Sequence, residues 1–406
     1  MESKIKNLIL KFAGVIDVAS VSAANFIISL FILRELTDTH YAIYVNLFSV
    51  LMLLSTLQNA FFNTALSVHS SKIKNIDEKR SQSLHICLLA NIVYVCLLLP
   101  SIFFSLHYPF WLVLCVYCSH ALYLNRELYR TYSFVFGHKG RVVLSATISI
   151  VILSSALILG ITFDYQSLLF VYGSLAIASL ASGIILLSGV SFQTIKKLNF
   201  KKAKDIIASF AKWTSLGSLA TWGQNNSYTY LATAIIGLEA TAALAAARLI
   251  TMPINVVASG IYMAEKPKWA ALYANNRVEL KRLSRVVSLS MFTFVLLFAL
   301  FSLLMIDFFS SVLTTVIDPT LLVLWFFATG IQCFKFSNSN ILNVSEDFKY
   351  LAVMGIKVAT LGVMASSILA VYFGPVGILI GFCLGELVHL YNTNKRIISN
   401  EVFYVR

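Results

Sequence analysis

The sequence is a succession of apolar stretches, each long enough to cross a bilayer, separated by short polar corners. A spanning helix needs about 20 predominantly apolar residues, and only helices and closed barrels satisfy their backbone hydrogen bonds in lipid. Hydrophobic residues make up 58% of the chain and charged residues 12%, against roughly 25% charged residues in soluble domains. These features exclude a soluble enzyme and predict an all-α, polytopic membrane protein.

Twelve stretches have the length of a spanning helix. They are 12–33, 42–65, 84–106, 109–130, 142–162, 167–189, 206–229, 238–261, 286–306, 319–342, 350–372 and 375–393. We predict the following domains: a six-helix lobe at 1–190, a cytoplasmic linker at 191–205, a second six-helix lobe at 206–393 and a cytoplasmic tail at 394–406. Transporters built from two repeats place the substrate site at the repeat interface.

The basic residues are distributed unevenly between the two sides of the predicted bundle. Of the 31 Lys and Arg residues, all but Arg34 and Arg248 fall in or near the loops of one side, and the loops of the other side are short and mildly acidic. Cytoplasmic loops of membrane proteins are enriched in Lys and Arg. The net charge of +13 therefore indicates topology rather than nucleic-acid binding, with both termini in the cytoplasm.

Arg248 lies well inside the apolar run of the eighth span. An ionisable residue at that depth is costly and is taken by default as a candidate functional residue. On a helical wheel it shares one side of the span with Thr241, Asn255 and Ser259. A guanidinium matches a phosphate through two parallel hydrogen bonds, so Arg248 is a candidate phosphate contact. The alternative is a structural ion pair with Glu386 or Asp17.

The seventh span carries a polar band that includes Trp222, Asn225 and Tyr228. Amides and aromatic rings suit sugar hydroxyls and sugar faces, which makes these residues candidate glycan contacts. Interhelical packing by small polar residues and an interfacial aromatic belt are the alternatives. Asn25, on a polar face of the first span, is a further candidate substrate contact. The alternative is again interhelical packing by small polar residues.

Five further charged residues are candidate substrate contacts or ion-coupling residues. Lys335 and Lys357 lie inside the cytoplasmic boundary and either attract an anionic head group or snorkel to the interface. Arg34 lies at the outer end of the first span. It either snorkels to the membrane interface or forms a gate on the exit side. Asp17 and Glu386 are candidates for ion coupling, or else partners of a buried cation.

The sequence contains no recognisable catalytic motif, such as HExxH, GxSxG or a P-loop. Arg126 and Arg130 end the predicted fourth span and are interpreted as topology determinants. We predict no metal and no cofactor.

Four stretches resemble one transporter family: FILRELTDTHYAIY (31–44), NRELYRTYSFVFGHKGRVVL (125–144), the G-x-E-A corner between the seventh and eighth spans within 210–253, and FGPVGILIGFCLGE (373–386). They are similar to the O-antigen (Wzx-type) polysaccharide flippases of the multidrug/oligosaccharidyl-lipid/polysaccharide (MOP) exporter superfamily. In the first stretch, Thr37 and Ala42 replace the family's usual glycines.

The resemblance implies a two-lobed, MATE-like bundle that opens alternately to each side of a bacterial inner membrane. The implied substrate is an undecaprenyl-pyrophosphate-linked oligosaccharide, moved from the cytoplasmic to the periplasmic leaflet. It implies a cationic cavity, to which Arg248, Lys335 and Lys357 would contribute, and a glycan polymerase and a chain-length regulator as protein partners. A MATE-like antiporter of small molecules or ions is the alternative function. A membrane enzyme is disfavoured because no external loop is long enough for an active site.

Overall fold

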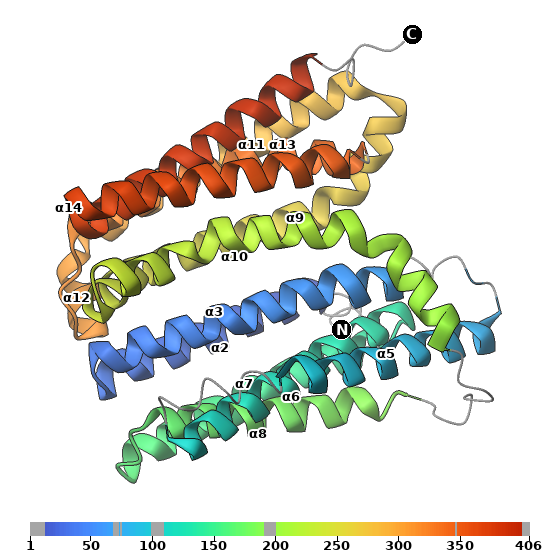
Figure 1. Ribbon diagram of the computed structural model, residues 1–406, viewed down its shortest axis with the longest axis horizontal. Coiled ribbons are helices and arrows are strands. Elements are labelled where there is room, and N and C mark those ends of the chain that lie inside the picture. Colours follow the sequence, from blue (N-terminus) through green and yellow to red (C-terminus); the bar gives the residue numbers. More distant parts are fainter. Residues whose placement is uncertain are drawn as a thin grey trace, which may run out of the picture. The chain divides into compact units, whose positions relative to one another are not determined.

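The computed structural model describes residues 13–67, 73, 75–98, 109–190, 200–345 and 347–399 (Figure 1). These residues are nearly all helical, and no strand occurs among them. The long helices are α2 (Ala13–Glu35), α3 (Asp38–Gln58), α5 (Ile76–Leu98), α6 (Phe110–Val135), α7 (Lys139–Thr162), α8 (Leu168–Leu187), α9 (Phe200–Ile235), α10 (Leu238–Asn275), α11 (Arg277–Leu304), α13 (Pro319–Val344) and α14 (Phe348–Ser399). A short helix, α12 (Ile306–Leu313), was not predicted from the sequence.

Two of these helices are interrupted. α3 passes into a π-helical segment, η1 (Asn59–Asn63), and α14 is broken at Gly374, which has a φ of 58° and precedes Pro375. With α14 counted as two helices, the described residues form twelve long helices, as the sequence predicts. Among the described residues, eight helical stretches are long and apolar enough to cross a membrane, and one of them covers nearly all of α14 (Phe348–Ile398). The chain is therefore an all-α, multi-pass membrane protein.

The chain divides into two compact units. Unit 1 comprises 1–36 and 50–215, and unit 2 comprises 37–49 and 216–406. The sequence places the division in the linker 191–205, of which 191–199 lie outside the described residues. In the structure one division falls between α2 and α3, and the other two fall inside helices, one within α3 and one within α9.

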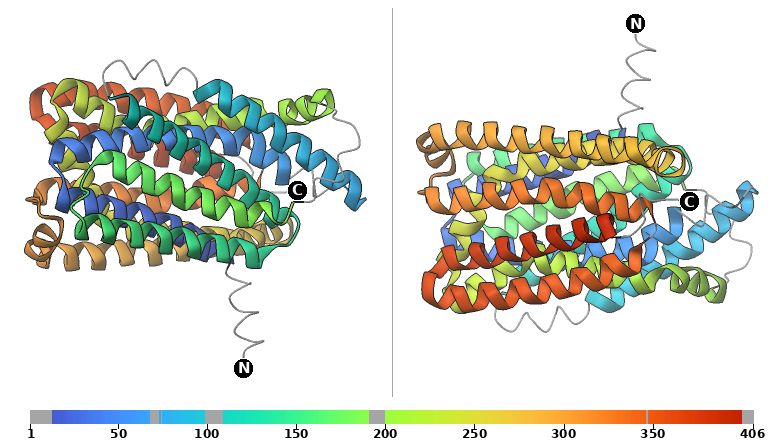
Figure 2. Two further views of the ribbon diagram at one scale, coloured as in Figure 1. Left: turned by 90° about the horizontal axis from the view of Figure 1, so that it is seen from below. Right: turned by 90° about the horizontal axis from the view of Figure 1, so that it is seen from above.

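Each unit is a bundle of packed helices, and Figure 2 shows these helices from two further directions. In unit 1, α8 packs against α6 and α7, and α7 also packs against α2. In unit 2, α13 is central and packs against α10, α11 and α14. Two thirds of the most apolar window of α13 is buried, so this helix forms the core of unit 2 and carries side chains that lipid does not reach.

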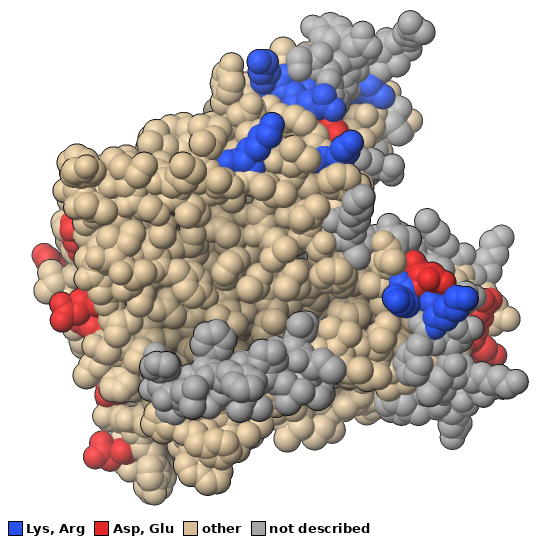
Figure 3. Space-filling view, viewed as in Figure 1, with Lys and Arg blue, Asp and Glu red and all other residues tan. Residues whose placement is uncertain are grey.

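Acidic residues lie at several helix ends in both units. In unit 2, Glu239, Asp307 and Asp318 lie at the starts of α10, α12 and α13. In unit 1, Gln166 donates to Glu35 over 3.0 Å and brings the end of α2 beside the turn before α8. On the face drawn in Figure 3, the visible Lys and Arg side chains gather in two groups with acidic side chains beside them, and further acidic side chains lie apart from these groups.

The two halves of α14 approach each other closely at Gly381. A Cβ atom at this position would overlap the backbone of Ser366 in the first half of the helix. We therefore expect Gly381→Ala to lower the free energy of unfolding by about 1–3 kcal/mol, the usual cost of overpacking. Thermal unfolding of the purified protein in detergent measures this loss. Gly223→Ala is the matched control, because a Cβ there meets nothing within 4 Å, and an equal loss in both variants would contradict the close contact.

Candidate functional site

Part of the polar band of α9 contacts α3 within unit 2. Trp222 Nε1 donates to the carbonyl of Ser49 over 2.8 Å, and the Tyr230 hydroxyl lies 2.5 Å from Ser49 Oγ. Asn46 Nδ2 donates to Thr233 Oγ1 over 2.8 Å. Trp222, predicted as a glycan contact, thus takes part in interhelical packing in this structure.

Arg248 of α10 lies among aromatic side chains of unit 2. Its Nη1 donates to the carbonyl of Asn225 over 3.0 Å, and its Cζ lies 5.0 Å and 5.1 Å from the ring centroids of Tyr228 and Trp325. Such cation–π contacts stabilise a guanidinium without neutralising it. No carboxylate forms an ion pair with Arg248 among the residues that the structure describes. Asp17 and Glu386, the partners considered from the sequence, pair with other residues.

The aromatic rings around Arg248 are themselves fixed. Trp325 Nε1 donates to the carbonyl of Leu244 over 3.0 Å, and the Tyr228 and Trp325 rings meet edge to face at 5.1 Å. Tyr228 is buried, whereas Asn225 and Arg248 are half-buried. The structure therefore brings together three predicted residues, Arg248, Asn225 and Tyr228.

Lys335 and Glu386 form a buried ion pair between α13 and α14. Their Nζ and Oε2 atoms are 2.6 Å apart, and the side chains are 5% and 0% exposed. Two amides complete the cluster, because Gln224 and Gln332 donate to Glu386 Oε1 over 2.8 Å and 3.2 Å. His389 Nδ1 lies 3.4 Å from Gln224 Oε1. Two residues predicted in separate roles, head-group attraction and ion coupling, are thus direct partners.

A second charged cluster lies in unit 1. Asp17 of α2 pairs with Arg126 over 3.2 Å and with Arg130, and both arginines pair with Glu127 over 2.8 Å. Arg126 also donates to Ser182 of α8 over 2.7 Å. Two positive and two negative charges balance in this buried cluster.

This cluster corrects the interpretation of Arg126 and Arg130 as topology determinants. α6 continues to Val135, so neither arginine ends the helix, and Arg126 is 3% exposed. The sequence did hold a signal: Glu127 lies directly between the two arginines in RELYR, where a purely topological cluster needs no acid. A carboxylate three residues before an arginine lies on the same helix face.

The remaining predicted residues lie apart from these clusters. Asn25 is buried in α2. Arg34 is exposed at the end of α2, close to Glu35. Lys357 is exposed on a face of α14 that also carries Ile356 and Leu361. This exposed position is consistent with the snorkelling alternative, in which the ammonium group of the lysine reaches the membrane interface.

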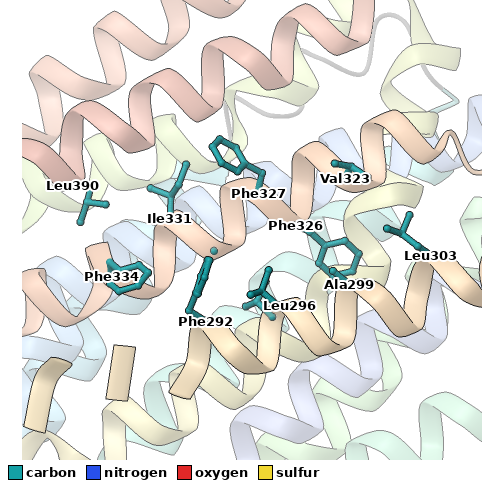
Figure 4. Close-up of a pocket in the computed structure, with 12 residues that line it drawn as sticks. Phe292, Leu296, Ala299, Leu303, Val323, Phe326, Phe327, Ile331, Phe334 and Leu390 are labelled. Atoms are coloured by element: carbon teal, nitrogen blue, oxygen red, sulfur yellow. The ribbon is translucent and has the colours of Figure 1, made fainter. Parts of the chain in front are cut away.

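Unit 2 also contains a pocket of about 440 Å³ between α11 and α13 (Figure 4). Phe292, Leu296, Phe326 and Phe334 line it, and Leu390 of α14 closes one side. Leu296 is more than half exposed, so the pocket opens outward. The described residues that line it carry no charge, and it offers nothing to hold a polar head group.

No family model matches this sequence, and no curated protein matches it. Several solved structures do match this chain. A multidrug resistance MATE family transporter of the MOP superfamily in an inward-facing conformation has a TM-score of 0.72 at 15% identity, covering 94% of this chain and 96% of its own. A MOP superfamily transporter from Pyrococcus furiosus has a TM-score of 0.67 at 13% identity, covering 98% and 96%. A mutant MATE transporter from Vibrio cholerae has a TM-score of 0.62 at 14% identity, covering 98% and 97%.

These identities are too low to transfer a substrate, but the coverage of both chains is nearly complete. The match extends over both units and over the twelve long helices. The chain therefore has the fold of the MATE family transporters of the MOP superfamily.

Proposed function

We propose that this protein is a flippase that moves an undecaprenyl-pyrophosphate-linked oligosaccharide from the cytoplasmic to the periplasmic leaflet of a bacterial inner membrane by alternating access. Arg248 carries the proposal. Its guanidinium is half-buried, is held by Asn225 and two aromatic rings, and has no ion-pair partner among the described residues. A phosphate bound there would supply the missing negative charge and offset the cost of placing an arginine at this depth.

The charges inside the two units also favour an anionic substrate. The acidic residues at depth in the described spans are Asp17, Glu127 and Glu386, and each pairs with an arginine or a lysine. A MATE-like exporter of organic cations would need a free carboxylate, and these three are neutralised. The Pyrococcus furiosus structure is described as having a binding pocket of reversed polarity that suggests a different function. Pocket charge therefore varies among proteins with this fold.

Substitution of Arg248 tests the proposal. In a strain that lacks the gene, we expect Arg248→Ala to lower translocation of lipid-linked repeat units by about 10- to 100-fold, because hydrogen bonds to charged groups contribute about 1.5–3 kcal/mol. The measurement is the amount of repeat unit in each leaflet at matched protein level, and units should accumulate on the cytoplasmic side.

Two controls define the outcome. Lys357→Ala removes a positive charge from an exposed position and should leave transport unchanged, and Arg248→Lys should retain only part of it because an ammonium lacks the two-pronged geometry. Normal transport by Arg248→Ala would reduce Arg248 to a structural role. Unchanged surface glycan in the deletion strain would refute the flippase assignment itself.

The proposal also covers the orientation of the protein in the membrane and its partner proteins. Both termini would lie in the cytoplasm, on the basic side of the bundle. A glycan polymerase and a chain-length regulator would use the translocated units. The protein itself would carry out no catalysis and need no cofactor, and nucleic acid would not be a partner.

A further inference from the structure

Unit 1 contains a pocket of about 730 Å³ whose walls come from three separate helices. Leu57, Phe61 and Phe62 belong to α3 and η1, Leu89 and Val93 to α5, and Ile207 to the first part of α9. Its volume falls within the range of roughly 300–1,000 Å³ that is typical of ligand pockets. Apart from Gln58 and two lysines, the residues that line it are apolar.

The two lysines are Lys201 and Lys204 of α9, the only charged residues among those described as lining the pocket. They are three residues apart, so they lie on one face of the helix, and both are exposed. Ala203 and Ile207 are buried in the same stretch. The start of α9, which runs near α5 in Figure 1, is therefore amphipathic, with an apolar side against unit 1 and two ammonium groups at the pocket.

The π-helical segment η1 shapes the facing wall. Such segments are frequent at functional sites. Within η1, the carbonyl of Ala60 accepts a hydrogen bond from Thr214 Oγ1 of α9 over 3.3 Å. Gln58, immediately before η1, is 1% exposed and donates to the carbonyl of Leu124. Its Oε1 has no donor among the described residues, so it can accept a hydrogen bond from a hydroxyl group or a water.

The combination of apolar walls and basic residues separates this pocket from the one in Figure 4, whose lining residues are uncharged. We propose that the unit 1 pocket is a binding site for an anionic phospholipid of the bilayer. An acyl chain would lie against Phe61, Leu89 and Val93, and Lys201 and Lys204 would hold the phosphate. The occupied site would fix the start of α9 against η1 and α5. This inference does not depend on the identity of the transported substrate.

Native mass spectrometry of the full-length protein in detergent tests the site, with phosphatidylglycerol as the anionic probe and phosphatidylcholine as the zwitterionic one. A lysine near an anionic lipid surface contributes enough attraction that loss of two lysines should weaken binding by about 30-fold. We therefore expect Lys201→Gln/Lys204→Gln to lose its preference for phosphatidylglycerol. Val93→Trp, which fills the pocket without changing the charge, should reduce binding of both lipids.

Matched variants in unit 2 provide the controls. Arg282→Gln/Arg285→Gln removes two exposed charges with the same spacing, and Ala299→Trp fills the pocket of Figure 4. Both should bind phosphatidylglycerol like the wild type. Undiminished binding by the lysine variant or by Val93→Trp would overturn the proposal. So would displacement of phosphatidylglycerol by an equal amount of undecaprenyl phosphate, since that outcome would assign the pocket to a polyisoprenyl lipid.

Discussion

Replacing Glu386 with alanine is expected to lower the free energy of unfolding by about 3–5 kcal/mol, the cost of removing one partner of a buried ion pair. Lys335 would keep its ammonium group in a 5% exposed position with no carboxylate within reach. Gln224 and Gln332 would lose their common acceptor at the same time. Thermal or denaturant unfolding of the purified protein in detergent, followed by tryptophan fluorescence, measures this loss.

A second substitution shows whether the loss comes from the stranded charge. Lys335→Met combined with Glu386→Leu should recover most of the stability, because replacing a buried ion pair by apolar residues of similar volume is often neutral. Asp347→Ala breaks a partly exposed pair with Arg396 and should cost at most about 1 kcal/mol. If Glu386→Ala costs no more than Asp347→Ala, the Lys335–Glu386 pair does not stabilise unit 2.

Asp17→Ala should destabilise unit 1 to a similar extent, by about 3–5 kcal/mol. Asp17 is 0% exposed and contacts both Arg126 and Arg130, so its removal leaves two guanidinium groups sharing Glu127. Asp17→Asn should cost less because the amide oxygen still accepts hydrogen bonds. The same unfolding measurement applies to both variants.

The cluster in unit 1 also allows a charge-balanced test. In Asp17→Ala/Arg130→Met, one positive and one negative charge are removed together, and the Arg126–Glu127 pair remains neutral. We expect this double variant to be more stable than Asp17→Ala alone. Asp205→Ala, at an exposed position of the same unit, is the control. A double variant that is less stable than the single one would show that the Arg130–Glu127 pair contributes more stability than the unbalanced positive charge costs.

Much of the fold follows from local features of the sequence. Length and hydropathy predict the twelve helices, because each span satisfies its own backbone hydrogen bonds. Gly374 and Pro375 mark the turn within α14. The short helix α12 and the π-helical segment η1 were not predicted, because neither has a distinctive hydropathy pattern. The division of the chain inside α3 and α9 depends on tertiary contacts, which a linear pattern does not contain.

The contacts within the candidate site are also set by tertiary packing, and the sequence predicts fewer of them than of the helices. The sequence identifies Arg248, Lys335, Asp17 and Glu386 as unusual, because charge at depth stands out in an apolar run. The sequence does not show which of these charged residues form ion pairs with one another. Arg248 lies on aromatic rings, Lys335 meets Glu386, and Asp17 meets two arginines that seemed to belong to the membrane surface. Partner choice is set by helix packing between distant segments.

The separation of these partners along the chain affects how the protein is made. Asp17 is synthesised 109 residues before Arg126, and membrane proteins emerge from the ribosome N-terminus first. α2 therefore leaves the ribosome carrying a carboxylate whose counter-charges do not yet exist. Because Asp17 lies close to the start of α2, the nascent helix can keep this group at the bilayer surface while α3 and α5 follow. We expect α2 to reach its final depth only after α6 has entered the membrane with the two arginines that pair with Asp17.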